Sequence, residues 1–321
     1  MKAIALNNQT LNWTDHPDLP EPAADEVAID VAWAGMNRAD LMQSKGAYPP
    51  PPGASEILGL EVSGRVAAVG ENVSHLEPGD EVCALLTGGG YASRVNVPSA
   101  QVLPVPAGLT LKQAAALPEV FATAWMNLYM VAGVKPEERV LVHAAASGLG
   151  TATIQLAVAM GNPVFATAGS DDKLAVCRTL GATGTWNRHN GSFAEAVKDW
   201  GGADMVLDPV GGDYIAENQK CLNVEGRIVL IGLMGGTDAK LSTVAMLRKR
   251  QRVMGSTLRA QPVSVKGEVM DALYEHVWPR LASGEIKPVI DRTWPIEEAN
   301  EAMTYLASNE STGKVLLAVN P

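Results

Sequence analysis

The segment from Val140 to Ala157, VLVHAAASGLGTATIQLA, constrains the fold more than any other part of the chain. Its apolar start predicts a buried strand, which runs into a tight turn of small residues, and the turn opens a helix. Small residues let a phosphate approach the main chain, while the first turn of a helix offers free N–H groups and the positive end of the helix dipole. The segment therefore predicts a strand–turn–helix unit that binds the pyrophosphate of a dinucleotide.

The turn departs from the usual G-x-G-x-x-G pattern. With Gly150 as the third glycine, Ala145 and Ser147 fill the first two positions, and Gly148 is an additional glycine. The strand before the turn and the helix after it favour nucleotide binding more strongly than the motif does. The alternative is an ordinary strand-to-helix turn packed tightly by small residues.

The rest of the chain shows two different patterns of expected secondary structure. The first hundred residues read as β-rich, with short apolar runs at Val27–Ala34, Val62–Val69 and Val82–Leu86, separated by turns and by a stiff proline loop at Tyr48–Ser55. Thr110 and Gln113 form a capping box ahead of a helical stretch that breaks at Pro118. From Arg139 strands and helices alternate, which is typical of βαβ units and a parallel sheet. One expected helix has Ser170 as N-cap and ends at Gly181, and another is capped by Ser192 and Glu195. After Arg259 we expect two helices, over Val265–Leu281 and Ile296–Ser308, and then a terminal strand.

Composition restricts the range of functions. A chain of 321 residues suggests about two domains, and a hydrophobic content of 47% provides a packed core. The formal net charge of −10 argues against binding to nucleic acid or an anionic membrane. Cys83, Cys177 and Cys221 are far apart and odd in number, so we expect no disulfide framework and a cytoplasmic location. None of the five histidines stands in a motif typical of a general base, so we expect them to be structural or on the surface.

The second strand of the alternating region indicates which nicotinamide cofactor is used. An NAD site usually places a carboxylate at the end of this strand, but here the strand ends in Ala168 and Gly169. Ser170 and Lys173 follow at a helix N-terminus, and Arg188 lies beyond the next strand, so these residues favour the 2′-phosphate of NADPH over NADH. Asp171 and Asp172 oppose this interpretation if they face the phosphate. A solvent-facing lysine and a loop arginine are the alternative interpretations.

Three further small-residue turns follow expected strands. They are DPVGG (208–212), GLMGG (232–236) and GSTL (255–258). The carboxyl ends of parallel strands line the ligand crevice, so these turns are expected near the nicotinamide, although plain turn chemistry also explains them.

The chain resembles the medium-chain dehydrogenase/reductase superfamily, in its zinc-free quinone oxidoreductase branch and most closely the tumour-suppressor-inducible subgroup. The motifs that carry the resemblance are AGMNRADLMQ, GAYPPPPGASEILGLEVSG, AAVGENVSHLEPGDEV, GGGYASRV, LPEVFATAW, HAAASGLGTATIQLA, TAGSDDKL, LDPVGG and IGLMGG, spread over nearly the whole chain. The resemblance implies an α/β chain with a GroES-like β-rich catalytic domain (1–118 and 262–321) and a Rossmann domain with a doubly wound parallel sheet (119–261). It also implies NADPH in the interdomain cleft and a homodimer joined through the Rossmann domains.

The same resemblance assigns roles to individual residues. Asn37 matches a position beside the nicotinamide ribose and the substrate, and Tyr48 is the candidate for contacting the substrate oxygen. A turn-stabilising asparagine and a rim aromatic are the alternatives. The positions that match cofactor-binding loops are Thr123, Ser147, Gly148, Leu149, Gly150, Gly169, Ser170, Lys173, Arg188, Val210, Gly232, Leu233, Met234, Ser256, Thr257 and, more weakly, Lys314. Arg188 departs from the family, which often has a tyrosine near the adenosine.

The expected activity is zinc-independent hydride transfer from NADPH to a small-molecule quinone. Zinc-dependent relatives have a cysteine where this chain has Asn37 and a histidine where it has Leu60, and their structural-zinc lobe is absent, so no metal is expected. Quinones leave a stabilised oxyanion, for which a donor such as Tyr48 suffices. One alternative is a reductase of α,β-unsaturated carbonyls or enoyl thioesters. The other is an NADPH-binding protein with an interaction role, for which the basic run Arg248–Arg250 is a candidate patch.

Overall fold

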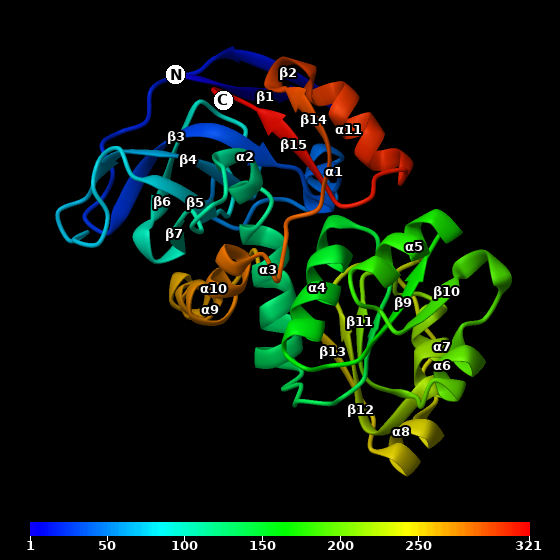
Figure 1. Ribbon diagram of the computed structural model, residues 1–321. Helices are drawn as coiled ribbons and strands as arrows, with labels where there is room; N and C mark the ends of the chain where they lie inside the picture. Colours follow the sequence, from blue (N-terminus) through cyan, green and yellow to red (C-terminus); the bar gives the residue numbers. More distant parts are fainter. The chain divides into compact units, whose positions relative to one another are not determined.

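The computed structural model describes all residues, 1–321, and they divide into two compact units. Unit 1 comprises residues 1–122 and 258–321, and unit 2 comprises residues 123–257. The division therefore falls four residues from each boundary suggested by the sequence, which lay after residues 118 and 261. Figure 1 labels the helices and strands of both units.

Unit 1 is built on a mixed sheet in which both ends of the chain take part. Its order is β14-β15-β3-β4-β5-β7, with β6 also pairing with β3, and β1 and β2 form a separate hairpin. The strands are β1 (Lys2–Asn7), β2 (Thr10–Asp15), β3 (Glu26–Gly35), β4 (Glu61–Val69), β5 (Glu81–Leu85), β6 (Arg94–Pro98), β7 (Val102–Pro104), β14 (Ile290–Pro295) and β15 (Lys314–Ala318). The C-terminal strand β15 runs antiparallel to β3, so the tail of the chain returns to the first sheet (red beside blue in Figure 1).

Six helices accompany this sheet. They are α1 (Arg38–Ser44), α2 (Leu111–Ala114), the first part of α3 (Pro118–Trp125), α9 (Val263–His276), α10 (Trp278–Ser283) and α11 (Ala299–Ser308). The predicted capping box is confirmed, because the Thr110 side chain accepts a hydrogen bond from the Gln113 amide. The single long helix expected over Val265–Leu281 is wrong: α9 ends at His276, and α10 restarts with Pro279 in its first turn. Proline lacks the amide hydrogen that a continuous helix would need at this point.

Unit 2 is a six-stranded parallel sheet with helices on both faces (Figure 1). The strand order is β10-β9-β8-β11-β12-β13. The strands are β8 (Val140–Val142), β9 (Val164–Ala168), β10 (Gly184–Asn187), β11 (Ala203–Asp208), β12 (Leu222–Leu230) and β13 (Arg252–Gly255). The helices are α4 (Gly148–Ala159), α5 (Asp171–Thr179), α6 (Ala194–Asp199), α7 (Tyr214–Cys221) and α8 (Thr243–Lys249), preceded by a π-helical turn at Met126–Val131. This is the doubly wound α/β arrangement that the alternating sequence predicted.

The caps of the helices in unit 2 follow the sequence with one exception. Ser170 caps α5, and Gly181 follows its end with a φ of 106°. Phe193 rather than Ser192 stands at the N-cap position of α6, but the Ser192 hydroxyl accepts from the Ala194 amide at 3.2 Å while it donates to the Glu217 carboxylate. A hydroxyl can donate one hydrogen bond and accept others, so Ser192 serves the start of α6 and Glu217 at the same time.

Each unit has an apolar core of its own. Unit 1 has its core between the sheet and α11, centred on residues such as Ile29, Val62 and Leu317, while unit 2 packs Leu141, Val206 and Ile228 beneath its helices. All three cysteines are buried and free. No helix has the length and apolar character that crossing a membrane would require.

Candidate functional site

The turn after β8 has the geometry of an anion-binding helix start. Ser147 is the N-cap of α4, and its hydroxyl oxygen accepts from the Gly150 amide at 3.1 Å. The amides of Gly148 and Leu149 lie in the first helical turn, where no intrahelical acceptor exists. A Cβ at Gly150 would lie 2.4 Å from the Ala145 carbonyl oxygen, so only glycine permits this close approach of helix and turn.

Ala144 is the strained residue of this turn. Its φ of 49° lies in the left-handed region, which a residue with a Cβ adopts only at a cost. Nothing in the sequence pattern of the turn indicates this strain. It lies directly before the helix start, and backbone strain of this kind is commonly associated with ligand-binding turns.

The end of β9 gathers the residues predicted to recognise a 2′-phosphate. The Ser170 hydroxyl accepts from the Lys173 amide at 3.3 Å, and the Arg188 side chain packs over Gly169, where a Cβ would lie 3.3 Å from Arg188 Nε. The β9–β10 pairing places these loops side by side, because Asn187 lies opposite Ala168. The Ser170 hydroxyl, the first-turn amides of α5 and the Arg188 guanidinium therefore lie at the ends of two neighbouring strands, and Lys173 belongs to the same helical turn.

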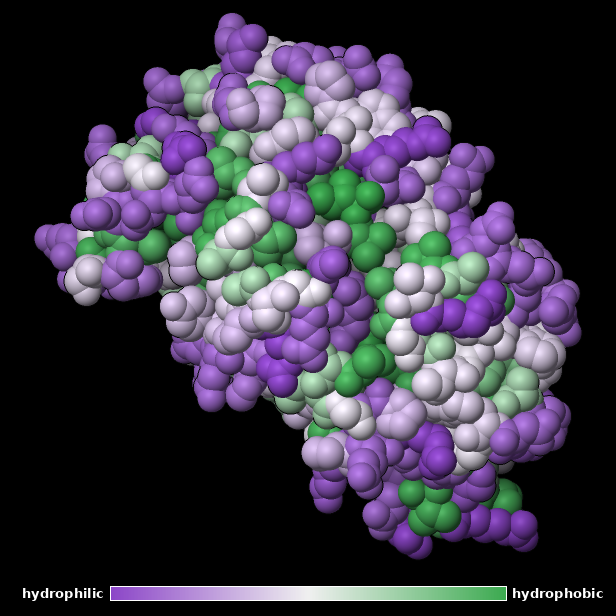
Figure 2. Space-filling model, in the orientation of Figure 1, coloured by the Kyte–Doolittle hydropathy of each residue, from purple (hydrophilic) through white to green (hydrophobic).

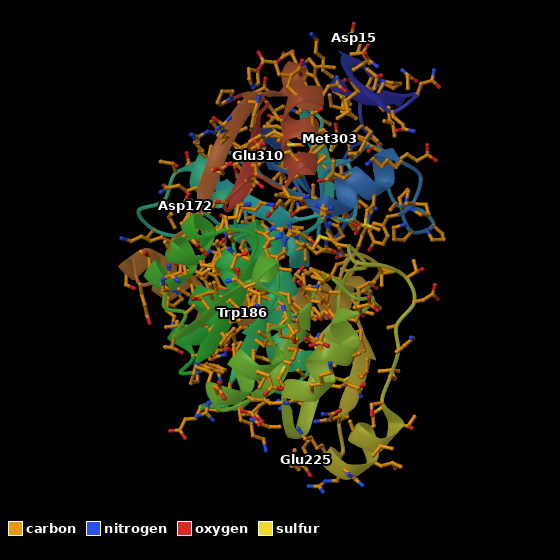
Figure 3. All side chains as sticks on the ribbon, turned by 90° about the vertical axis from the view of Figure 1, so that its right-hand side faces the viewer. Asp15, Asp172, Trp186, Glu225, Met303 and Glu310 are labelled. Atoms are coloured by element: carbon orange, nitrogen blue, oxygen red, sulfur yellow. The ribbon has the colours of Figure 1, made fainter.

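The two aspartates beside this cluster are placed differently. The Asp171 carboxylate accepts from Asn187 Nδ2 at 3.0 Å and so ties the start of α5 to the end of β10. Asp172 is exposed in the first turn of α5 (labelled in Figure 3). Asp171 thus has a structural partner, and Asp172 faces solvent as the first turn of a helix favours.

A buried polar network supports the loop after β11. The His143 ring contacts Thr167 Oγ1 at 2.8 Å through Nδ1 and Asn218 Oδ1 at 2.7 Å through Nε2, and Asn218 Nδ2 donates to Asp208 at 2.9 Å. The other Asp208 oxygen accepts from the Val210 and Gly211 amides. Burial lowers the pKa of His143, so the ring is held neutral. These contacts agree with the structural role expected for His143.

The remaining predicted loops of unit 2 lie at the same sheet edge. A bridge between Gly211 and Gly236 joins the loops that follow β11 and β12, and the Ser256 amide donates to the Leu230 carbonyl oxygen. Leu233 and Met234 are exposed at 47% and 42%, although both are large and apolar. Thr257 follows β13, and Thr123 lies in α3. The carboxyl ends of the parallel strands thus carry the predicted residues of unit 2 other than Thr123.

In unit 1, Asn37 belongs to a buried charged network. Asn37 Nδ2 donates to Glu61 Oε1 at 3.0 Å, and Asn37 Oδ1 accepts from Lys314 Nζ at 2.8 Å. Lys314 also forms a salt bridge with Glu61 at 2.5 Å and donates to the Met36 carbonyl oxygen. The three N–H groups of Lys314 are therefore engaged inside unit 1, which argues against its predicted role as a phosphate ligand. No local sequence pattern pairs β4 with β15, so the network could not be read from the sequence.

Two further carboxyl groups lie near this network. Asp40 is fully buried and accepts from the amides of Asn37 and Gly59 and from the Tyr91 hydroxyl, and burial raises its pKa to about 6. Glu119, at the start of α3, donates its amide to Glu61 Oε2 at 2.9 Å. Burial, followed by repulsion from Glu61, raises the pKa of Glu119 to about 8. The Glu119 side chain is therefore mostly in its protonated form at neutral pH.

The Tyr48 ring stacks against the Arg259 guanidinium. Its half-buried ring is 5.4 Å from the Arg259 guanidinium carbon, and its carbonyl oxygen accepts from Arg259 Nη1 at 3.4 Å. Arg259 Nε donates to the Thr87 carbonyl oxygen at 2.8 Å, and Lys266 Nζ donates to the Thr87 hydroxyl at 2.6 Å. Arg259 and Lys266 are both buried. Neither was selected from the sequence, because each stands in an unremarkable loop or helix pattern.

The residues of this structure do not form a metal centre. No three or more histidine, cysteine, aspartate or glutamate side chains come together in a way that would hold a metal ion. Asn37 is engaged with Glu61 and Lys314, Leu60 is buried in the core, and Cys83 is buried on β5, where its pKa is raised by burial. The donor set therefore does not fit zinc, which needs several nitrogen, sulfur or oxygen ligands in one place.

Two protein families match separate stretches of the chain. The family described as "Alcohol dehydrogenase GroES-like domain" matches residues 23–107, and the family described as "Zinc-binding dehydrogenase" matches residues 148–275. The "Synaptic vesicle membrane protein VAT-1 homolog" of Rattus norvegicus is 34% identical over 94% of this chain and 79% of its own length. "Quinone oxidoreductase-like protein 2" of Bos taurus is 34% identical over 92% of this chain and 85% of its own length.

Solved structures with the same fold cover almost the whole chain. The quinone oxidoreductase from Thermus thermophilus, solved also with NADPH, is 35% identical with a TM-score of 0.84 over 99% of this chain and 100% of its own. CurK enoyl reductase is 29% identical with a TM-score of 0.85, covering 99% of this chain and 98% of its own. An NAD-dependent alcohol dehydrogenase is 31% identical with a TM-score of 0.86, covering 99% and 100%. The chain therefore belongs to the medium-chain dehydrogenase/reductase superfamily of oxidoreductases, with quinone oxidoreductases among its relatives.

Proposed function

We propose that this chain is an NADPH-dependent quinone oxidoreductase that transfers hydride without zinc. The observation that carries the proposal is the cluster at the end of β9, where Arg188 packs over Gly169 beside the Ser170 cap of α5. This cluster lies one strand away from the anion-binding turn at Ser147. A dinucleotide with an additional phosphate on its adenosine ribose requires this combination, because both phosphate groups need donors at neighbouring strand ends.

The residues of unit 2 fit the cofactor as follows. The first-turn amides of α4, with Ser147 as cap, would hold the pyrophosphate, and Ser170, Lys173 and Arg188 would hold the 2′-phosphate. The loops containing Val210, Gly232 and Ser256 would line the nicotinamide side. Thr123, Leu233, Met234 and Thr257 are assigned to the same side through the resemblance. When bound, a nicotinamide cofactor supplies the hydride.

Unit 1 would supply the acceptor site. Tyr48 would donate a hydrogen bond to the quinone oxygen that gains negative charge as the hydride arrives, and Asn37 would help to position the acceptor. The Asn37 amide is held rigidly by Glu61 and Lys314, so its orientation is fixed before a ligand binds. A quinone leaves a stabilised oxyanion, so a hydrogen-bond donor can replace the Lewis acid that alcohol oxidation requires.

The experiment that tests this proposal follows NADPH oxidation by absorbance with a panel of quinones, after the protein has been dialysed against a chelator. We expect turnover with NADPH that exceeds turnover with NADH, and no loss of rate after chelation. Equal or tighter binding of NADH in a fluorescence titration would refute the choice of cofactor. Stoichiometric zinc in a metal analysis would refute zinc independence.

A second candidate is a reductase of α,β-unsaturated carbonyls or enoyl thioesters. It is favoured by the similarity to CurK enoyl reductase and by Glu119, which would be a protonated acid at neutral pH and so able to supply a proton to a substrate carbon. Reduction of an enone in deuterated water distinguishes the two. Deuterium at the α-carbon together with a kcat/KM above that for quinones would favour the enone reductase. A non-catalytic NADPH-binding protein is the remaining alternative, and it would oxidise NADPH with neither acceptor.

We also propose a homodimer formed through unit 2. The edge strand β13 has an unpaired side, and Leu241, Val244 and Leu247 on and beside α8 are exposed at 48%, 55% and 81%. Figure 2 shows apolar surface at the end of unit 2 that α8 occupies in Figure 1. An exposed strand edge and exposed apolar side chains are each suited to pairing with a second copy.

A further inference from the structure

Arg259 and Lys266 are two buried cations that both donate to Thr87, and Arg259 also stacks on the Tyr48 ring. Arg259 is 3% exposed and Lys266 is 2% exposed, and Glu119 is among the groups that raise the pKa of each. Their hydrogen-bond partners are neutral oxygens: the Thr87 and Tyr48 carbonyls for Arg259, and the Thr87 hydroxyl for Lys266. In a chain with a net charge of −10, this is an unusual concentration of positive charge.

One atom of this pair lacks any partner. Arg259 Nη2 is buried and makes no hydrogen bond, although Nε and Nη1 of the same side chain are both engaged. Leaving a charged donor unpaired in the interior is costly, and such atoms mark places where a ligand, an ion or a reacting group completes the site. The two cations also repel each other, and Arg259 is one of the causes that lower the pKa of Lys266. Negative charge nearby would relieve both penalties.

The charged groups that face Tyr48 and the two cations are few. Burial is the main cause that raises the pKa of the Tyr48 phenol. Glu119 raises this pKa further, and Arg259 lowers it. The charges of Asp40 and Glu119 raise the pKa of Arg259, and that of Glu119 raises the pKa of Lys266. Burial raises the pKa of Glu119 to about 8, which weakens its negative charge near neutral pH relative to an ordinary carboxylate.

We propose that Arg259, supported by Lys266, is a positioning residue that holds Tyr48 and stabilises negative charge on the oxygen of an acceptor hydrogen-bonded to the Tyr48 hydroxyl. The inference rests on the proposed function, in which Tyr48 contacts the acceptor. Arg259 binds Tyr48 twice, through the ring face and through the main-chain oxygen, and fixes the loop to Thr87. The acceptor class is therefore one whose oxygen becomes anionic, such as a quinone or an enone.

The electron count follows from this arrangement. One hydride carries two electrons to the quinone, whose carbonyl oxygen becomes an oxyanion. A proton from the Tyr48 hydroxyl or from water then completes the hydroquinone, and Tyr48 recovers its proton from solvent. A cation beneath the phenol ring lowers the energy of both anionic states, the quinone oxyanion and the transient phenolate.

The test uses the full chain and the variants Arg259→Gln and Arg259→Lys. The pKa of Tyr48 is measured by NMR on protein labelled at tyrosine Cζ, and Tyr48→Phe assigns the resonance. The kcat and KM for menadione with NADPH are measured on the same proteins. The control is Arg292→Gln, because Arg292 lies 4.6 Å from the Tyr305 ring in the same unit and forms a comparable cation–aromatic stack away from Tyr48.

We expect Arg259→Gln to raise the Tyr48 pKa by about one unit and to lower kcat about tenfold, since one pKa unit corresponds to a tenfold change in an equilibrium. The KM for NADPH should stay within about twofold, as expected for an interaction made in the transition state. Arg259→Lys should recover part of both effects, and Arg292→Gln should change neither. If Arg259→Gln does not fold, Lys266→Met should raise the Tyr48 pKa by a smaller amount.

An unchanged Tyr48 pKa in Arg259→Gln, or an equal loss of kcat in Arg292→Gln, would overturn the inference. Failure of the proposed function is a separate result, because wild-type protein that does not reduce menadione refutes the function. In that case the NMR titration still decides whether Arg259 acts on Tyr48.

Discussion

The Arg188 side chain packs across Gly169 so closely that a Cβ at Gly169 would lie 3.3 Å from Arg188 Nε. The glycine removes a side chain where an aspartate or glutamate would otherwise hold a ribose hydroxyl, and the arginine occupies the space with a positive charge. The two residues come from loops that follow neighbouring strands, β9 and β10. Their contact is the structural basis for expecting NADPH rather than NADH.

Replacement of Arg188 by glutamine should weaken the binding of NADPH but not that of NADH. A charge-assisted hydrogen bond to phosphate contributes about 1.5–3 kcal/mol, so NADPH affinity should fall at least about tenfold while NADH affinity stays unchanged. The measurement is a fluorescence titration with each cofactor. The matched control is Arg178→Gln, because Arg178 is exposed near the end of α5 and donates to Thr185 instead. A loss of NADH affinity equal to that of NADPH would contradict the assignment.

Replacement of Gly150 by alanine should disturb the turn before α4. The added Cβ would lie 2.4 Å from the Ala145 carbonyl oxygen, so the helix start must move away from the turn. Overpacking of this kind costs about 1–3 kcal/mol, and we expect a lower denaturation midpoint together with loss of NADPH binding. Urea denaturation and cofactor titration on the same protein measure both effects. Full NADPH affinity in this variant would show that the pyrophosphate binds elsewhere.

Replacement of Tyr48 by phenylalanine should lower kcat for quinones and leave NADPH affinity unchanged. The ring, and with it the stack on Arg259, is retained in this variant, so only the hydroxyl is lost. Removing one donor to a developing oxyanion costs about 10²-fold in kcat. Steady-state kinetics with menadione gives the rate, and unchanged turnover would remove Tyr48 from the reaction.

Glu119 predicts a specific dependence of stability on pH. Its pKa in the folded protein is about 8, above the value of about 4.3 expected in the unfolded chain. Between these values the folded state holds the proton and the unfolded state releases it, so the free energy of unfolding falls as pH rises from about 4 to 8. Glu119→Gln cannot ionise and should lose this dependence.

The measurement is urea denaturation of wild type and Glu119→Gln at pH 5 and pH 9. Because the side chain is only partly buried, the full shift is discounted, and the variant should gain at least about 1 kcal/mol on wild type between the two pH values. Parallel stability curves would contradict the raised pKa.

The exposed apolar side chains near β13 predict the effect of a charge at the proposed dimer contact. Leu247 is 81% exposed, and Leu247→Glu should convert a dimer into a monomer in light scattering after size exclusion. A buried carboxylate without a partner is unfavourable at an apolar interface. The control is Tyr274→Glu on α9 of the other unit, where Tyr274 is 54% exposed, and it should leave the dimer intact. A monomeric wild type, or a dimer that survives Leu247→Glu, would place the contact elsewhere or remove it.

Local patterns in the sequence predicted much of the fold. The strand, turn and helix around Ser147, the Ser170 cap and the alternation from Arg139 onward depend on neighbours along the chain, and all are confirmed. The return of the C-terminal strand to β3 followed only from the family resemblance, since no local pattern specifies which distant strand β15 joins. The prediction of one helix over Val265–Leu281 was wrong, because Pro279 interrupts the helical hydrogen bonds there.

The candidate site was predictable only in part. Strand ends could be located from the sequence, so the loops of unit 2 were identified in advance. The charged groups of unit 1 could not be predicted, because their partners come from segments far apart in the chain. Glu61 pairs with Lys314, and Arg259 separately binds Thr87. Lys314 illustrates the difference, since its sequence position suggested a phosphate ligand and its contacts are with Met36, Asn37 and Glu61.

The most direct test of the proposed function is the stoichiometry of NADPH consumed and hydroquinone formed by chelator-treated protein. We expect one hydroquinone for each NADPH, a rate that chelation does not change, and a markedly lower kcat/KM with NADH. NADPH oxidation no faster than the blank across the quinone panel, or activity that appears only when zinc is restored, would contradict it.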